Sequence, residues 1–465
     1  MARIAVIGAG MGAMATAARL SVAGHQVTVY ERGATYGGAV GRYARDGFVF
    51  DTGPGLVHLP AVYRDLFVKT GKRPLEECAE LVQIDPAVRY VLPDGRTVTF
   101  PGGSHGGAAA AVEAVFGTGS GERWSAVLGR ARDAWDATRR PLLEEPLRPD
   151  REALGRDPYP ALRGSGLLRR RPPTLAEVAA RELGGDGFDG LLTSRVRAYG
   201  IDPATAPASA AVLPYMEQTF GSWYVRGGVR ELATAVYERC LERKVAFEFG
   251  AGVLEVLVRD ERVAGLLLAD GTEVAADAVV CGADPRQLRI PPGPASTPAD
   301  SAGAARWYTL FLALRGPRPA DAVHRTLLGA TTVLRPDDPA TRPDADHEAV
   351  TVHTVVTDGS APVAEELLAT AARAVPGLRE RLLWHELRTP ADVEAATGAV
   401  DGRVPAPALA GAGGRLLHPA NTTGVPGLYL AGGWAHPGGG LAHAGMTGAL
   451  VAGLIVEGAD FRGSR

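Results

Sequence analysis

A glycine-rich turn between a strand and a helix near the N-terminus constrains the fold more than any other feature of the chain. Residues 3–7 (RIAVI) are typical of a short buried strand, residues 13–22 of an alanine-rich helix, and residues 26–30 (QVTVY) of a second strand. The turn that joins the first strand to the helix has the pattern G-x-G-x-x-A. This order predicts a β-α-β unit that binds a dinucleotide.

Each small residue of this turn has a physical role in such a unit. Gly8 permits the tight turn, and Gly10 lets the backbone approach a pyrophosphate closely. Ala13 keeps the helix close to the strand, and the helix N-terminus offers free N–H groups to the phosphates. Glu31 ends the second strand about 20 residues further on, where a carboxylate accepts hydrogen bonds from a ribose. The spacing therefore favours a dinucleotide without a 2′-phosphate.

A second glycine pair, Gly37-Gly38, follows Glu31 after five residues. This segment resembles the E-x-x-x-x-x-G-G segment of FAD enzymes of the glutathione-reductase type, and the resemblance favours FAD over a nicotinamide cofactor. A fold that binds only NAD does not need this pair. No second G-x-G-x-x-G stands at a later strand–helix junction, so we expect no separate NAD(P) domain. The reduced flavin would then be reoxidised by oxygen or a quinone.

Composition narrows the class of protein further. The 465 residues are 46% hydrophobic and 22% charged, which is typical of a globular chain and excludes a disordered one. A net charge of -3 makes a nucleic-acid partner improbable on electrostatic grounds. Three widely spaced cysteines predict neither a disulfide framework nor a zinc cluster, so no metal site is expected. No apolar run is long enough for a transmembrane helix, and the cytoplasm is the expected location.

Glycine loops lie near both ends of the chain, and a segment of different character separates them. This organisation predicts an α/β fold with a discontinuous FAD-binding Rossmann domain of the glutathione-reductase type, interrupted by an α+β substrate domain. We assign residues 1–70, 205–285 and 420–465 to the FAD-binding domain. Residues 71–204 and 286–419 form the substrate domain, with a helical lid around residues 122–182. The sequence leaves the oligomeric state open.

The chain resembles the phytoene desaturase family, which comprises carotenoid desaturases of the FAD-dependent amine oxidase superfamily. Four segments carry the resemblance in the family's order: the N-terminal turn through residues 50–54 (FDTGP), residues 206–228 with their WYVRGG ending, residues 277–285 (DAVVCGADP) and residues 427–440 with their HPGGG ending. Two positions depart from the family pattern. Ala39 stands where an arginine usually follows the glycine pair, and the bulky Trp434 stands where the family has a small residue.

The resemblance implies a set of FAD contacts drawn from both ends of the chain. These are Gly8, Gly10, Met11, Gly12, Ala13, Glu31, Arg32, Gly38, Val253, Gly432, Gly433, Gly440, Leu441 and Ala442. The last three open a helix whose N-terminus would stabilise negative charge on the reduced flavin ring.

By resemblance, we expect an FAD-dependent oxidoreductase that desaturates an apolar polyene or isoprenoid by hydride transfer to flavin N5. The protein's own contribution would be a dry, positioned pocket and a base for the proton. His436 and His443 near the flavin loop and Glu217 before the WYVRGG segment are the candidate catalytic residues, and His58 is a candidate for the pocket wall.

Three alternatives stay open at this stage. The same fold could oxidise an amine, a porphyrinogen or a pathway-specific natural product. It could also serve a redox-neutral isomerisation, or bind flavin without catalysis.

The basic run at residues 169–171 stands between a Leu-Leu and a Pro-Pro pair. It is either a solvated loop or a peripheral contact with an anionic membrane.

Overall fold

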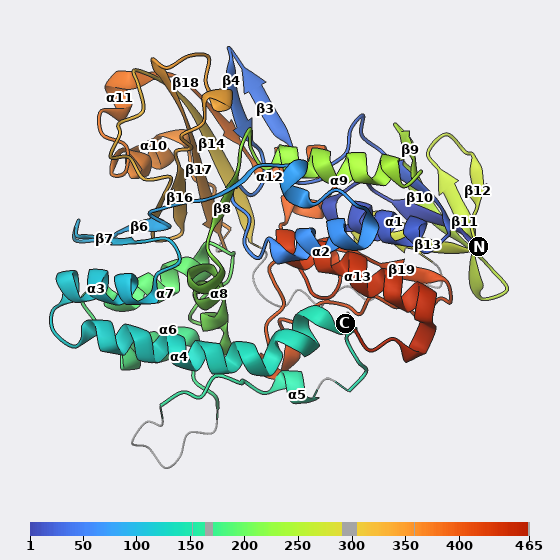
Figure 1. Ribbon diagram of the computed structural model, residues 1–465, viewed down its shortest axis with the longest axis horizontal. Helices are drawn as coiled ribbons and strands as arrows, with labels where there is room; N and C mark the ends of the chain where they lie inside the picture. Colours follow the sequence, from blue (N-terminus) through green and yellow to red (C-terminus); the bar gives the residue numbers. More distant parts are fainter. Residues whose placement is uncertain (151, 163–170, 291–304, 358, 464–465) are drawn as a thin grey trace.

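A computed structural model describes residues 1–150, 152–162, 171–290, 305–357 and 359–463. It has two regions, which Figure 1 shows side by side: a parallel sheet with its helices, and a mixed sheet with a helical layer beneath it. Among the described residues, no helix combines the length and the apolar character needed to cross a bilayer.

The first region is a five-stranded parallel sheet in the order β19-β13-β1-β2-β9. Its strands are β1 (Arg3–Ile7), β2 (Gln26–Glu31), β9 (Ala246–Phe249), β13 (Ala278–Cys281) and β19 (Leu428–Leu430). Its helices are α1 (Met11–Val22), α2 (Ala61–Thr70), α9 (Arg230–Glu242) and α13 (Leu441–Glu457). Strands from three distant parts of the chain thus build one sheet, which confirms the predicted discontinuous Rossmann fold.

Small side chains let the first and last helices of the sequence lie together. Helices α1 and α13 run side by side beneath the sheet (Figure 1). A Cβ added at Gly448 would lie 2.7 Å from Ala15 Cβ, so glycine is needed there for the helices to approach. The N-terminal and C-terminal parts of the chain therefore pack against each other through α1 and α13.

A three-stranded antiparallel sheet extends this region: β10 (Val253–Arg259), β11 (Arg262–Leu268) and β12 (Glu273–Ala275). Residues 273–280 read as one strand in the sequence, but the structure divides them. The first part pairs with β11, and Asp277 then turns the chain by accepting a hydrogen bond from the Arg3 N–H, at 2.7 Å. The second part, β13, joins the parallel sheet beside β1.

The second region is a seven-stranded mixed sheet in the order β18-β14-β17-β16-β15-β6-β7. Its strands are β6 (Val88–Val91), β7 (Thr97–Phe100), β14 (Arg306–Arg315), β15 (Arg325–Leu328), β16 (Thr331–Leu334), β17 (His347–Val356) and β18 (Leu382–Arg388). The hairpin that Asp94-Gly95 indicates forms as β6 and β7. Two short pairs link the regions: β3 (Arg42–Arg45) with β4 (Phe48–Asp51), and β5 (Leu81–Gln83) with β8 (Trp223–Val225).

Helices cover the mixed sheet. The helical layer comprises α3 (His105–Phe116), α4 (Ser120–Arg139), α5 (Glu152–Gly155), α6 (Leu175–Glu182), α7 (Phe188–Arg197) and α8 (Val212–Phe220). The remaining helices are α10 (Ala364–Ala372), α11 (Leu378–Arg381) and α12 (Pro390–Thr397). The predicted lid, residues 122–182, corresponds to most of α4 together with α5 and α6. The domain boundaries and the function of this segment as a lid stay predictions.

Candidate functional site

The turn after β1 leaves open space where a pyrophosphate would lie. Gly8 has a φ of +86°, which favours glycine, and its N–H donates to the Tyr30 carbonyl at 2.8 Å. No described side chain caps α1, so the N–H groups of its first turn are available to an anion. A Cβ added at Gly10 would meet no other atom within 4 Å.

Close backbone approach closes the other side of this cradle. A Cβ at Gly12 would lie 2.7 Å from Gly432 Cα and 2.8 Å from Thr447 Oγ1. Gly38 has a φ of +59°, and a Cβ added to it would lie 3.0 Å from Gly10 Cα. The predicted FAD contacts at both ends of the chain therefore lie together, and Gly12 and Gly38 leave no space for larger side chains.

The predicted ribose acid lies at the mouth of the turn. Glu31 Oε2 accepts the Ala9 N–H and Oε1 accepts the Gly33 N–H, both at 2.7 Å. The Ala251 N–H donates to the Glu31 carbonyl at 2.9 Å, which brings the start of β10, with Val253, next to it. Arg32 points away and donates to the Glu394 and Ala395 carbonyls at the end of α12. Its expected contact with FAD stays a prediction.

Arg230 supports the glycine pair, and the sequence analysis missed it. Its guanidinium donates to the carbonyls of Tyr36 and Val40 and to Thr35 Oγ1, and stacks 4.1 Å from the Tyr36 ring centroid. Arg230 therefore holds the loop that contains Ala39, the residue that stands in place of the family's usual arginine. The signal was available, because Arg230 stands two residues after the WYVRGG segment.

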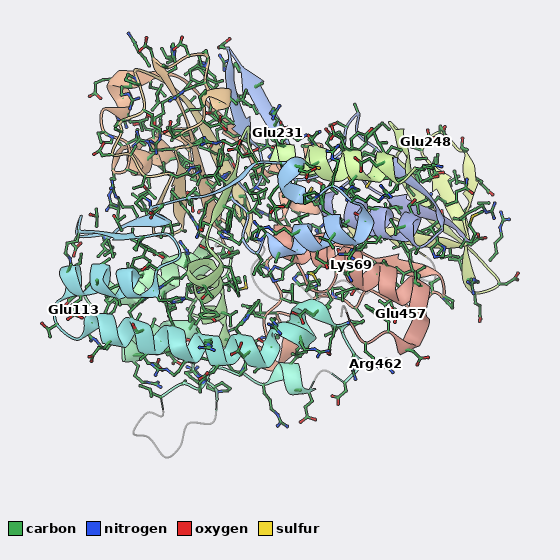
Figure 2. All side chains as sticks on the ribbon, viewed as in Figure 1. Lys69, Glu113, Glu231, Glu248, Glu457 and Arg462 are labelled. Carbon is green, nitrogen blue, oxygen red and sulfur yellow. The ribbon has the colours of Figure 1, made fainter. Side chains whose placement is uncertain are left out.

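Arg42, the nearest arginine after the glycine pair, does not take that position. It pairs with Glu231 and donates to the Gly227 carbonyl at 3.1 Å. Figure 2 shows Glu231 near the start of α9. Asp51 completes the support by accepting the N–H groups of Val229 and Arg230 at the start of α9. Burial raises the pKa of Asp51 to about 6.

The two candidate histidines differ in environment. His436 is completely buried, and its Nε2 lies 3.0 Å from the Glu145 carbonyl oxygen, which gives the ring a structural contact. His443 is half-buried in the first turn of α13, beside Gly440. Burial, together with the nearby His418 and His436, lowers the pKa of His443 to about 4. His443 is therefore neutral at pH 7 and able to accept a proton.

Glu217 lies at the centre of a buried ionic cluster. Arg325 Nη1 donates to Glu217 Oε2 at 2.7 Å, and Arg195 pairs with the same oxygen. Tyr199 donates to Oε1 at 2.6 Å, and His58 Nε2 lies 3.6 Å from Oε1. We call these five side chains the Glu217 cluster.

The charges of this cluster make Glu217 a poor base. Burial alone would raise the pKa of Glu217, but Arg195 and Arg325 outweigh it and hold the pKa below its usual range. Burial also lowers the pKa of His58 to about 4, so His58 is neutral at pH 7. His443 lies beside Gly440, one of the predicted flavin contacts, and its role as a base stays a prediction.

Apolar side chains connect the Glu217 cluster to the first turns of α13. One continuous core includes Leu59 and Val62 near His58, Leu213 and Met216 on α8, Leu327 on β15, and Ala442 and Met446 on α13. A buried apolar region thus extends from the cluster to the predicted flavin contacts. The basic run at residues 169–171 lies outside the described residues except for Arg171, which pairs with Glu177. Membrane contact stays a prediction.

The chain belongs to the family of flavin-containing amine oxidoreductases, whose family model matches residues 14–456. It is 31% identical over 284 residues to a zeta-carotene-forming phytoene desaturase of Myxococcus xanthus, a match that covers 61% of this chain and 53% of the relative. It is 28% identical over 283 residues to a 4,4'-diapophytoene desaturase of Staphylococcus haemolyticus, covering 60% of this chain and 55% of the relative. The matches span just over half of these relatives.

Solved structures of low sequence identity share the fold. Putrescine oxidase bound to putrescine matches with a TM-score of 0.67 at 16% identity, covering 98% of this chain and 99% of that one. Cyclohexylamine oxidase from Brevibacterium oxydans matches with a TM-score of 0.62 at 17% identity and the same coverage. These structures confirm the predicted α/β fold. The family model confirms the class of flavin-dependent oxidoreductase and FAD as the cofactor, and the two desaturase relatives confirm the resemblance to carotenoid desaturases.

Proposed function

We propose that this protein desaturates an apolar polyene or isoprenoid chain, and that His443 accepts the proton released from the substrate. The observation that carries the proposal is the set of buried apolar side chains between the Glu217 cluster and the first turns of α13, beside the predicted flavin contacts. A long hydrocarbon is bound by apolar side chains of this kind, because each apolar group moved out of water contributes favourably to binding. The relatives named as phytoene and diapophytoene desaturases support this substrate class.

The cradle formed by Gly10, Gly12, Gly38 and Glu31 fits FAD, which supplies a hydride acceptor when bound. The chain's own residues do the remaining work. Apolar side chains of α8, β15 and α13 would contact the bound hydrocarbon, exclude water and orient it. His443, neutral at pH 7, takes the proton on a ring nitrogen at the N-terminal end of α13.

Anaerobic mixing of the FAD-loaded protein with a polyene tests the proposal. Desaturation predicts loss of the flavin absorbance and a red shift of the polyene spectrum, and oxygen or a quinone should then restore the flavin. A redox-neutral isomerase would form product only after prior reduction of the flavin. An amine that bleaches the flavin while no polyene does would also contradict the proposal.

His443→Gln tests the proton acceptor. Loss of a general base lowers a rate by roughly 10²–10⁴-fold, and the flavin should remain bound at native occupancy. His385→Gln, at an exposed histidine on β18, is the matched control and should leave the rate unchanged. If the rate of His443→Gln stays native, His443 is not the base.

A further inference from the structure

We infer that the Glu217 cluster binds a carboxylate, and that the apolar substrate therefore carries an acidic group at one end. This rests on the proposed function and narrows its substrate class. The cluster holds two guanidinium groups, Arg195 and Arg325, but a single carboxylate, Glu217. Across the described residues, neither arginine pairs with any other acidic side chain.

The charge balance of the cluster is one positive charge in excess. The aromatic and imidazole members are neutral at pH 7, because burial lowers the pKa of His58 to about 4 and raises the pKa of Tyr199. Arg195 is 3% exposed and Glu217 is 1% exposed. An uncompensated charge at such depth is costly, so the cluster is electrostatically complete only with one further anion.

Arg195 has the donors that such an anion would require. Its Nε and Nη1 are buried and have no hydrogen-bond partner among the described residues, although its Nη2 pairs with Glu217. The Tyr90 ring lies 5.9 Å from its Cζ and offers a cation–π contact, but no hydrogen-bond acceptor at that distance. Adjacent N–H groups of one guanidinium match the two oxygens of a carboxylate.

The surroundings of the cluster are apolar. Tyr90, whose ring lies 5.9 Å from Arg195 Cζ, belongs to the same buried apolar core as Leu213 and Leu327. A buried guanidinium with free donors beside hydrocarbon side chains matches a ligand that joins one carboxylate to an apolar chain. The single excess charge matches a monoanion better than a phosphate.

Calorimetric titration of the FAD-loaded protein with geranylgeranoate and with its methyl ester tests this inference, since the two probes share one chain and differ in charge. We expect the acid to bind at least about tenfold more tightly than the ester, a difference of about 1.4 kcal/mol. Arg195→Met should remove this preference by weakening acid binding alone. Glu217→Gln, which frees donors of both arginines, should strengthen acid binding.

Arg239→Met is the matched control for the loss of a buried arginine. Arg239 is 1% exposed, but its donors are paired with Glu242, the Phe67 and Arg73 carbonyls and Thr70. This variant should keep the native preference for the acid even if it is less stable. Equal affinity for acid and ester in the native protein would overturn the inference, as would an equal weakening of both probes by Arg195→Met.

Two further readouts separate this inference from the proposed function. If Arg195→Met shifts the flavin reduction potential and leaves acid affinity unchanged, the excess charge serves the reduced cofactor, and the carboxylate site is wrong. If a hydrocarbon polyene reduces the flavin equally fast in native protein and Arg195→Met, the result supports desaturation and contradicts the acidic end group. If the acid binds through Arg195 but neither probe nor polyene reduces the flavin, the result supports the carboxylate site and contradicts the desaturase proposal.

Discussion

The FAD cradle and the Glu217 cluster are built in different ways. The cradle depends on close backbone approach, because a Cβ at Gly12 or Gly38 would meet neighbouring backbone atoms. The Glu217 cluster depends on side chains, three of them buried and charged, that meet from α7, α8, β15 and two loops. Added side-chain volume should therefore damage the cradle, and a lost charge should damage the cluster.

Adding side-chain volume to the cradle should have the largest effect. Gly12→Val places a Cβ 2.7 Å from Gly432 Cα and 2.8 Å from the Ala444 carbonyl, both backbone atoms that cannot rotate away. Helix α13 must shift, and the purified protein should lack bound FAD, as its absorbance spectrum would show. Gly129→Val, at an exposed glycine of α4 with open space around it, is the control and should stay yellow. A yellow Gly12→Val protein would refute the close approach.

Removing a charge from the Glu217 cluster should have the next largest effect. Glu217→Leu leaves Arg195 and Arg325 buried without a counter-charge, so we expect the free energy of unfolding to fall by about 3–5 kcal/mol. Urea unfolding of the apoprotein measures the change without interference from FAD. Glu231→Leu removes the exposed partner of Arg42 and should cost at most about 1 kcal/mol. Equal losses in the two variants would contradict the assigned burial.

The contrast in building material also explains what could be predicted from the sequence. Gly8 to Ala13 act within six consecutive residues, so their spacing alone indicates the turn and its ligand. The members of the Glu217 cluster stand between residues 58 and 325, and no local pattern unites them. Glu217 itself could be singled out, but its two arginines could not. The division of residues 273–280 between two sheets was equally hidden, because both parts have strand character.

Lowering the pH should reduce the free energy of unfolding through His58, the neutral histidine of the Glu217 cluster. Burial lowers the pKa of His58 to about 4 in the folded protein, below the usual histidine value of 6.5. The unfolded chain therefore gains a proton first as the pH falls, and stability that is complete above pH 6.5 is lost down to pH 4. His58→Gln should reduce this acid-dependent loss by about 3 kcal/mol at most. Urea unfolding between pH 7 and 4 measures it, with His385→Gln as the exposed control. An unchanged pH dependence in His58→Gln would show that His58 titrates normally in the fold.

Arg230 is an exception to the contrast between a cradle of backbone and a cluster of side chains, because its long side chain supports the cradle. Its guanidinium binds two loop carbonyls and Thr35 beside the glycine pair. Hydrogen bonds from a charged group contribute roughly 1.5–3 kcal/mol, so Arg230→Met should weaken FAD binding by about tenfold, measured by fluorescence titration of the apoprotein. Arg42→Met removes a neighbouring arginine that binds Glu231 instead, and should leave FAD affinity native.

The outcome of this pair decides how the loop compensates for Ala39. If Arg42→Met weakens FAD binding and Arg230→Met does not, then an arginine close to the glycine pair in sequence still supports FAD, as in the family pattern, although Ala39 replaces the usual one. If only Arg230→Met does so, the support has moved to a helix that starts nearly 200 residues away. The cradle would then depend on the same kind of distant side-chain contact that builds the Glu217 cluster, and its glycine pattern alone would not be sufficient to hold FAD.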